Sequence, residues 1–395
     1  MKDEPAAVQR LSGVAIAGRA GAWEIEVAGG RIRALRPSTV AGDGLVLPML
    51  TDIHVHLDKT FTAARMPERA LSLHHAIEMM AADAQTWDEA DLRARAGRAL
   101  ERAYAHGTAR MRTHLDWEGA APPPAWPVLR ELAQDWRGRV DLELAALTPL
   151  DCFDVAGESI AREVAAQGGV LGAFVYRNDN IPAKLAQVFD LAERHGLALD
   201  FHVDEGLEPE AQGFDAIIAE TARRGLSGRV LCGHACALSI RPADDVARLL
   251  DRAASAGIGL VVLPTCNAWL QDGAPGRTPR LRGLAPLHEA RAAGVPVMIG
   301  SDNVRDGFYP FGDYDLFEAF RTAVPAAHLD PRAWLDAIAG IPAAWMGRDA
   351  GLREGGPADF IHIHAADLDD AVSRPRTRRE VWRGGRIITT REEPT

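Results

Sequence analysis

The sequence has few cysteines, no excess of basic residues and no paired-cysteine motif. Its four cysteines, Cys152, Cys232, Cys236 and Cys266, are scattered over 395 residues. This spacing excludes a disulfide scaffold, and no CxxC pair is present to form a zinc knot. With 44 basic against 55 acidic residues, the net charge is −11. Such a charge argues against a nucleic-acid partner or binding to an anionic membrane.

Long apolar runs are also absent. No segment approaches the roughly 20 apolar residues that a membrane-spanning helix needs. The first ten residues, MKDEPAAVQR, lack the apolar core of a secretory signal. We therefore expect a cytoplasmic protein with reduced thiols and no membrane partner. The chain is 47% hydrophobic, which is enough for one large core, or for a large domain with a small companion.

Short apolar runs alternate with longer segments of helical periodicity through the middle of the chain. Strand–helix alternation indicates parallel strands, and eight such units over about 250 residues match a closed barrel. The expected strands are 46–53, 108–114, 141–147, 169–175, 198–202, 229–233, 259–263 and 296–301. The expected helices include 91–105, 183–195, 209–224 and 243–256.

The two ends of the chain have a different pattern. Residues 22–28 and 31–35 flank a Gly-Gly turn, which predicts a hairpin, and residues 358–364 alternate before a second Gly-Gly turn at 384–385. Chain termini often lie close together, so we expect the ends to pair. The predicted fold is α/β. It comprises a (β/α)8 TIM barrel over 49–349 and a small β-sandwich domain formed by 1–48 and 350–395.

Polar residues stand at the ends of four of the expected strands. His54 and His56 end the first strand, and residues two apart lie on the same face of a strand. His202 ends the fifth strand, His234 the sixth and Asp302 the eighth. The carboxyl ends of barrel strands converge on one mouth, where catalytic groups lie. We therefore expect these side chains to meet.

A shared divalent cation would explain this set of residues. Burying four such groups without a common partner would cost several kcal/mol. Imidazoles with one carboxylate suit Zn²⁺ or Fe²⁺ better than Mg²⁺ or Ca²⁺, and Mn²⁺ also fits. The His-x-His pair alone would be explained equally well by an exposed loop. The four strand ends together indicate one metal site.

The local motifs resemble those of the amidohydrolase superfamily, and within it the cytosine deaminase branch. In the family's order they are DIHVHLDKT at 52–60, RTHLD at 112–116, HVDE at 202–205, GHACA at 233–237, and GSD at 300–302 followed by FYPFG at 308–312. The resemblance runs from about residue 45 to the end. It implies His54, His56, His202 and Asp302 as the ligands of one divalent metal ion.

The same resemblance implies roles for two further residues. His234 would contact the metal-bound water, with a hydrogen-bonding role behind the site as the alternative. Spacing alone leaves Asp204 and Glu205 open as the proton-transfer residue, and the family pattern selects Glu205. The fourth expected strand, 169–175, carries no lysine at its end. A carboxylated lysine bridging two metal ions is therefore not expected, which favours a mononuclear site.

The activity implied by this resemblance is hydrolytic deamination of a cytosine-like nitrogen heterocycle, within the hydrolases that act on C–N bonds of cyclic amidines. A divalent cation lowers the pKa of bound water to about 7. Hydroxide would attack the amine-bearing ring carbon, Asp302 and His234 would orient it, and ammonia would leave. The expected partner is a small heterocyclic substrate, and barrels of this kind commonly form homo-oligomers.

The sequence is compatible with two other functions. One is hydrolysis of another C–N bond, in an N-alkyl amino-triazine such as an ammelide or in a cyclic amide, because a fold does not determine a function. The other is a binding protein that has kept the barrel. That hypothesis predicts a missing ligand or proton-transfer residue, and none is missing from this sequence.

The substrate contacts depart from the family pattern. Cytosine deaminases carry a glutamine after the third strand, where this chain has LTPLD at 147–151. Losing a buried polar recognition group can change the substrate. Asn303 stands where an aspartate is frequent, and Phe308 where a tryptophan is common. The residues that we expect near the substrate are Asn303, Phe308, Lys59, Trp269, Asn267 and His114.

For several of these positions two roles are open. Lys59 either lines the pocket or pairs with Asp58 to hold its loop. His114 is either a substrate contact or part of a structural network with Arg112, which we expect to be structural. Arg305, like Asn303, is a candidate for reading a carbonyl group or an anionic substituent.

Overall fold

The computed structural model describes residues 8–42 and 44–388. Eight parallel strands form one sheet in the order β12-β11-β10-β9-β8-β7-β6-β5. Their bounds are β5 Leu50–Val55, β6 Thr108–Asp116, β7 Asp141–Pro149, β8 Val170–Val175, β9 Leu199–Val203, β10 Val230–His234, β11 Gly259–Val262 and β12 Val297–Ile299. The Asp302 N–H donates to the His54 carbonyl at 2.9 Å, which brings the two edges together. The predicted barrel is confirmed.

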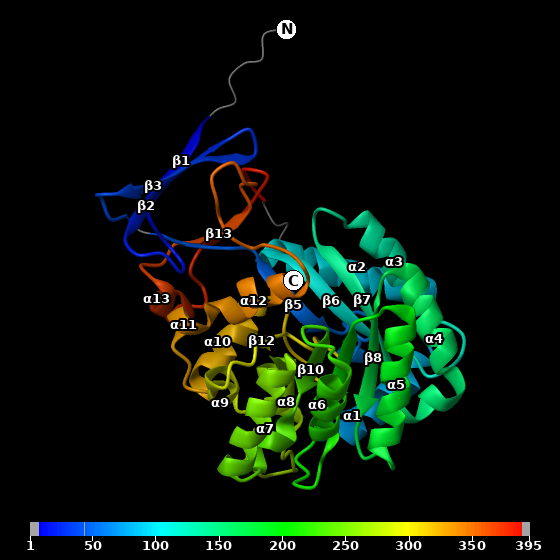
Figure 1. The fold of residues 1–395 in the computed structure, drawn as a ribbon. Coiled ribbons are helices and arrows are strands. Elements are labelled where there is room, and N and C mark those ends of the chain that lie inside the picture. The colour runs from blue at the N-terminus through cyan, green and yellow to red at the C-terminus, as the bar shows by residue number, and fades with distance from the viewer. Residues whose placement is uncertain (1–7, 43, 389–395) are drawn as a thin grey trace.

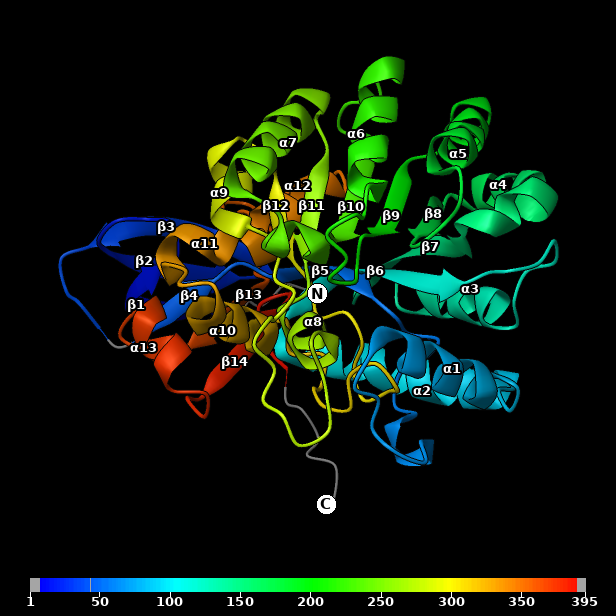
Figure 2. The same ribbon diagram turned by 90° about the horizontal axis from the view of Figure 1, so that it is seen from below.

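Helices surround the strands, as Figures 1 and 2 show. Their bounds are α1 Leu73–Ala84, α2 Glu89–His106, α3 Ala125–Asp135, α4 Phe153–Gln167, α5 Ile181–His195, α6 Gly213–Arg224, α7 Ala243–Ala256, α8 Pro264–Leu270, α9 Leu287–Ala292, α10 Leu316–Ala326, α11 Pro331–Trp334, α12 Gly340–Trp345 and α13 Leu368–Ser373, with short 3-10 turns at η1 Ala63–Arg65, η2 Leu150–Cys152, η3 Cys236–Ile240 and η4 Leu335–Ile338.

Helix α7 shows why these segments form helices against the barrel. Its buried residues recur at helical spacing: Val246, Leu249, Leu250 and Ala253 form one apolar stripe. Each fully buried leucine contributes about 1.5–3 kcal/mol relative to an exposed one. The helix ends at Gly257, whose φ of 68° is left-handed and unfavourable for other residues.

A second sheet contains strands from both ends of the chain, in the order β15-β14-β13-β4-β1-β2-β3. The bounds are β1 Gln9–Ile16, β2 Ala22–Ala28, β3 Arg31–Ser38, β4 Leu45–Leu47, β13 Phe360–Ile363, β14 Arg379–Arg383 and β15 Arg386–Ile387. The two ends join where β4 pairs antiparallel with β13. Figure 1 shows this sheet beside the barrel. The division at residues 48/49 and 349/350 stays a prediction.

The expected strand at 46–53 is wrong in one respect, because it spans two strands of different sheets. Strand β4 ends at Leu47 and β5 begins at Leu50. Pro48 lies between them and has no N–H to continue a ladder. Val46 packs in the core of the small sheet, whereas Leu50 packs in the barrel core. A continuous apolar run does not reveal that its two halves face different cores.

Within residues 8–42 and 44–388, we find no helix with both the length and the apolar character needed to cross a bilayer. The expectation that the chain begins without a secretory signal concerns residues 1–7 in large part, which lie outside the described residues. What the fold contributes to function is the barrel mouth, where the carboxyl ends of β5 to β12 converge.

Candidate functional site

Four side chains from three strand ends meet at the mouth of the barrel. His202 Nε2 lies 3.1 Å from His54 Nε2 and 3.2 Å from His56 Nε2. The Asp302 Oδ1 atom lies 3.3 Å from His56 Nε2 and 3.7 Å from His54 Nε2. All four residues are buried. The structure therefore brings together the four residues that the sequence indicated as ligands of one ion.

The chemistry of this cluster fits a divalent cation. Both Asp302 carboxylate oxygens are buried and without a hydrogen-bond partner among the described residues. Burial raises the pKa of Asp302 to about 7. Burial lowers the pKa of His54, His56 and His202 well below the ordinary value. The next largest cause is a neighbouring imidazole for His54 and His202, and the charge of Lys59 for His56. Neutral imidazoles beside an unpartnered carboxylate are what a metal ion satisfies.

The backbone at these strand ends is strained. Asp302 has φ 61°, His234 has φ 70° and Asp204 has φ 47°, all in the left-handed region. Such conformations cost non-glycine residues on the order of 1–3 kcal/mol each, and they concentrate at functional sites.

Gly233, which precedes His234, is needed for a different reason. A Cβ atom at this position would lie 2.7 Å from His54 Cε1, so only glycine leaves room for the imidazole.

His234 ends β10 next to this cluster. One ligand atom from each of His234, His54 and Asp302 lies within 4.8 Å of the others. His234 Nδ1 is 3.0 Å from Asn267 Nδ2 and 3.6 Å from Glu205 Oε1. Because an amide nitrogen donates, the Asn267 contact makes Nδ1 the acceptor and leaves the His234 proton on Nε2. Burial lowers the pKa of His234 to about 3, which keeps the ring neutral.

Glu205 and Asp204 differ in what their carboxylates contact. Asp204 accepts hydrogen bonds at 3.0 Å from the backbone N–H groups of Gly213 and Phe214, where α6 begins. Glu205 is buried near His234, and its pKa is raised well above the ordinary value by burial and by the charge of Asp302. A buried carboxyl group with a raised pKa suits proton transfer. This contrast favours Glu205 over Asp204.

His114 belongs to a buried network beneath the metal-ligand cluster. Its ring centroid is 4.2 Å from that of His54, and its Nε2 lies 3.2 Å from Asp200 Oδ2. Arg112 Nη1 donates to the same Asp200 oxygen at 2.8 Å. A ligand atom of His114 also lies within 4.8 Å of one from His54 and one from His202. The contacts with Asp200 support a positioning role for His114 and a structural role for Arg112.

Sequence reasoning missed Asp200, although a signal was present. The residue is a lone carboxylate within the apolar strand β9 and lies two positions before His202, so it shares its face. Burial alone would raise the pKa of Asp200, but His114 and Arg112 bring it below the ordinary value. The Asp200 carboxylate is therefore charged and depends on Arg112.

Replacing Arg112 by alanine is expected to lower the free energy of unfolding by about 3–5 kcal/mol, because it leaves the Asp200 charge buried without its cationic partner. Urea denaturation of the two proteins measures this change. Arg353→Ala is the matched control, since Arg353 pairs with Asp349 in an exposed position and should change stability by less than about 1 kcal/mol. Equal effects of the two substitutions would contradict the assignment.

Lys59 is buried and held by a carboxylate. Its Nζ donates to Asp116 Oδ1 at 2.7 Å and lies 3.9 Å from Asp58 Oδ2. The nitrogen also lies 3.2 Å from His56 Nδ1 and 5.9 Å from the centre of the Phe308 ring. These contacts favour a loop-holding ion pair, with Asp116 as the main partner in place of Asp58.

The other expected substrate contacts divide into two groups. Asn303 donates to Asp306 Oδ2 at 2.7 Å, and its Oδ1 lies 3.7 Å from Cys266 Sγ. Both ends of the Asn303 amide thus have contacts within the protein, whereas Asn267 has a partner for its nitrogen, His234, but none for its buried oxygen among the described residues. Trp269 and Phe308 instead belong to an aromatic and apolar cluster above the strand ends. This cluster also contains Phe174, Tyr176 and Tyr309, which sequence reasoning missed because single aromatic residues carry no spacing signal.

The chain is similar to known proteins along most of its length. Residues 160–389 match the model described as "Amidohydrolase family". A pterin deaminase from Rhizobium rhizogenes is 39% identical over 383 residues, covering 92% of this chain and 87% of that protein. An N-isopropylammelide isopropyl amidohydrolase from Pseudomonas sp. is 24% identical, covering 89% and 88%.

Solved structures share the whole fold. A 5-methylcytosine deaminase from Klebsiella pneumoniae superimposes with a TM-score of 0.85 at 22% identity, covering 98% of both chains. N-isopropylammelide isopropylaminohydrolase from Burkholderia multivorans gives a TM-score of 0.78 at 26% identity, covering 96% of this chain and 97% of the other. With a family model over more than half the chain and a 39% identical relative along most of it, this protein belongs to the amidohydrolase family.

Proposed function

We propose that this protein is a divalent-metal-dependent hydrolase that removes the amino group from an aromatic nitrogen heterocycle, and that the heterocycle is pterin-like. The convergence of His54, His56, His202 and Asp302 beside Glu205 carries this proposal. The 39% identical pterin deaminase supports the substrate class. In a pterin the amine-bearing ring carbon lies between two ring nitrogens, whereas in cytosine it adjoins one. Both rings therefore present the N=C–NH₂ unit of a cyclic amidine.

The aromatic cluster is consistent with a ring larger than a single pyrimidine. Phe174 and Tyr176 lie near the end of β8, Trp269 lies in α8 after β11, and Phe308 follows β12. All four pack in one cluster. Aromatic side chains bind planar rings by stacking or edge contacts. Because the family glutamine of cytosine deaminases is absent after β7, we rank a pterin-like substrate above cytosine itself.

His54, His56, His202 and Asp302 would hold the metal ion, and Zn²⁺ or Fe²⁺ suits this donor set best, with Mn²⁺ also compatible. When bound, the ion acts as a Lewis acid that makes hydroxide available from water at neutral pH. Glu205 delivers a proton to the ring nitrogen as the attacked carbon becomes tetrahedral. The proton that Asp302 accepts from the attacking water then reaches the amine, which leaves as ammonia. The remaining hydroxyl proton returns to Glu205 as the carbon becomes a carbonyl.

The neutral His234 ring has a separate task. With its proton on Nε2, it can donate to an oxygen at the reacting carbon, and Asp302 accepts a proton from the attacking water. Asn267 sets this tautomer through its 3.0 Å contact with Nδ1. The arrangement needs no change of charge on His234 during the reaction.

Asn267→Ala is therefore expected to lower kcat by about tenfold to hundredfold, with KM changed much less, because it removes the group that orients a reacting side chain. Asn267→Asp should also be impaired, because a carboxylate at this position accepts from Nδ1 and favours the opposite tautomer. Steady-state kinetics and metal analysis of both variants check this. Normal kcat in Asn267→Asp would contradict the tautomer assignment.

The proposed function is tested by ammonia release from a panel of heterocycles with the metal-loaded enzyme. We expect a pterin to be deaminated faster than isocytosine, cytosine or 5-methylcytosine. Opening of dihydropyrimidines or hydantoins, without ammonia release from any amino-heterocycle, would refute a deaminase.

One second candidate has a specific observation behind it. Two N-isopropylammelide hydrolases match at 24% and 26% identity along nearly the whole chain. The same residues could expel an alkylamine in place of ammonia. Release of isopropylamine from N-isopropylammelide at a higher kcat/KM than ammonia from a pterin would favour this alternative.

A further inference from the structure

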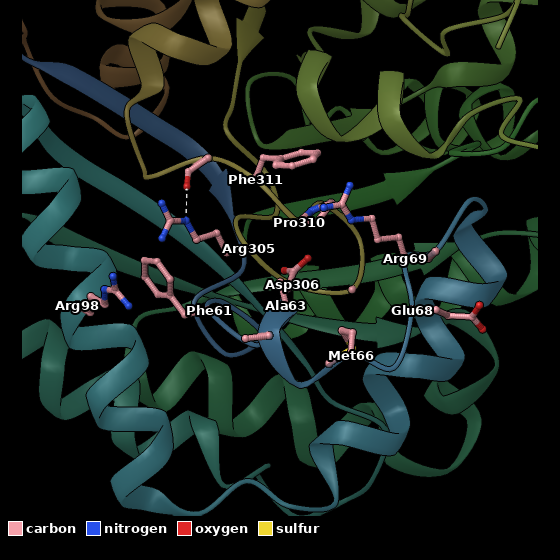
Figure 3. Close-up of a pocket in the computed structure, with 14 residues that line it drawn as sticks. Phe61, Ala63, Met66, Glu68, Arg69, Arg98, Arg305, Asp306, Pro310 and Phe311 are labelled. Atoms are coloured by element: carbon pink, nitrogen blue, oxygen red, sulfur yellow. Dashed lines mark hydrogen bonds between the residues drawn. The ribbon is translucent and has the colours of Figure 1, made fainter. Parts of the chain in front are cut away.

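A cavity of about 620 Å³ lies between the loop that follows β5 and the loop that follows β12, as Figure 3 shows. Its volume is within the range of small-molecule sites. The lining residues come from 61–70, from 305–312 and from helix α2, which contributes Arg98. The cavity is open on one side, and none of the reaction steps proposed above involves it.

This cavity adjoins the metal-ligand cluster through Asp306. Asp306 lines the cavity, and its Oδ2 accepts from Asn303, the residue that follows Asp302, at 2.7 Å. Its Oδ1 accepts from the backbone N–H groups of Phe308 and Tyr309 at 2.9 and 3.0 Å. Asp306 therefore connects the wall of the cavity to the loop that carries Asp302. The Asp306 oxygens already have partners within the protein.

Guanidinium groups dominate the charge of the lining. The lining contains three arginines, Arg69, Arg98 and Arg305, and two acidic residues, Asp306 and Glu68. Glu68 lies 3.4 Å from His75 Nε2, and in Figure 3 its carboxylate points away from the other lining residues. Along the described part of the chain, neither Arg69 nor Arg305 forms an ion pair with a carboxylate.

Aromatic rings hold these two arginines in place. The Arg69 guanidinium lies 5.1 Å from the ring centre of Phe311, and that of Arg305 lies 5.8 Å from the ring centre of Phe61. Arg305 Nε donates to the Gly312 carbonyl at 2.8 Å, which leaves its two terminal nitrogens for a ligand. Guanidinium groups on aromatic rings retain their charge and their fork of donors.

The backbone that presents Phe61 and Arg305 is strained. Their φ values are 58° and 51°, in the left-handed region that bulky residues avoid. The two loops are joined by hydrogen bonds from the Phe61 N–H to the Val304 carbonyl at 3.3 Å and from the Ala63 N–H to the Arg305 carbonyl at 2.7 Å. Strain kept at two neighbouring positions is typical of a preformed binding site.

We propose that this cavity binds an oxyanion, a carboxylate or a phosphate, that the heterocyclic substrate carries on the side away from the reacting amine. Arg305 and Arg69 would bind the oxyanion, since a guanidinium matches its geometry with paired N–H donors. The inference rests on the proposed function. It narrows the substrate class to acidic derivatives of the heterocycle.

The experiment compares two heterocycles that differ only by a ring-borne carboxylate remote from the amine. We expect the wild-type enzyme to prefer the acid by about tenfold or more in kcat/KM, as for a charge-assisted contact. The Arg69→Gln/Arg305→Gln double variant should lose most of that preference. Arg248→Gln, which changes an exposed arginine on α7, should retain it. A preference that is absent in wild type, or unchanged in the double variant, overturns the proposal.

Two further measurements distinguish a substrate-borne oxyanion from a free one, and binding from turnover. Free acetate or phosphate should inhibit turnover of the acid competitively; if it instead raises turnover of the neutral heterocycle, the anion is a separate effector and the proposal is wrong. Calorimetric binding of both heterocycles decides the question even if neither is deaminated. In that case tighter binding of the acid that is lost in the double variant supports the cavity, while the deaminase proposal fails independently.

Discussion

Replacing Glu205 by glutamine is expected to lower kcat by about 10²–10⁴-fold, the usual contribution of a general acid–base residue. Glutamine has nearly the same shape but cannot carry a proton between water, ring nitrogen and leaving amine. Glu205 is buried, 3.6 Å from His234 Nδ1, and has a raised pKa. Single-turnover kinetics and metal analysis measure the effect, and the metal content should stay that of the wild type.

Asp204→Asn is the matched control, because it changes the neighbouring carboxylate. Asp204 accepts from the backbone N–H groups of Gly213 and Phe214, so its loss should weaken the start of α6 and lower stability. Its effect on kcat should be much smaller than that of Glu205→Gln. If Glu205→Gln were fully active while Asp204→Asn was inactive, the two residues would have to exchange roles.

Removing the metal ion is expected to reduce turnover to the background rate. The four ligand atoms come from the end of β5 and the residue after it, from β9, and from Asp302 in the loop after β12. Dialysis against a chelator should abolish activity, and adding Zn²⁺, Fe²⁺ or Mn²⁺ should restore it to different extents. The ion that gives the highest turnover is the one of the three that best supports catalysis.

His202→Ala provides the matching variant. His202 Nε2 contacts both His54 and His56, so its loss should prevent both metal binding and recovery after chelation. Arg248→Gln should respond to chelation and reconstitution as the wild type does. Full activity of a protein shown to contain less than about 0.05 metal ions per chain would contradict metal dependence.

Much of the fold could be predicted because its signals are local and repeated. Apolar runs alternate with helical segments, and parallel strands require their polar ends to meet on one side. This placed His54, His202 and Asp302 together across some 250 positions of sequence. The motifs around them identified the family, which the family model and the 39% identical relative confirm.

What could not be predicted depends on contacts between distant elements. Asn267 in α8 and His234 at the end of β10 are 33 positions apart, and only the folded chain brings the Asn267 amide nitrogen to 3.0 Å from His234 Nδ1. Lys59 donates a hydrogen bond to Asp116 of β6 at 2.7 Å, whereas its sequence neighbour Asp58 is 3.9 Å away. Pro48 divided one apolar run between two sheets. In each case several contacts are equally compatible with the spacing of residues in the sequence, and only the folded structure shows which contact forms.

The most direct test is a crystal structure with diffraction data collected on both sides of the absorption edge of the bound metal. We predict one strong anomalous peak in each chain, bonded to Nε2 of His54, His56 and His202 and to a carboxylate oxygen of Asp302. A peak at another place, or none here in a crystal of active enzyme, would contradict the metal-centred mechanism.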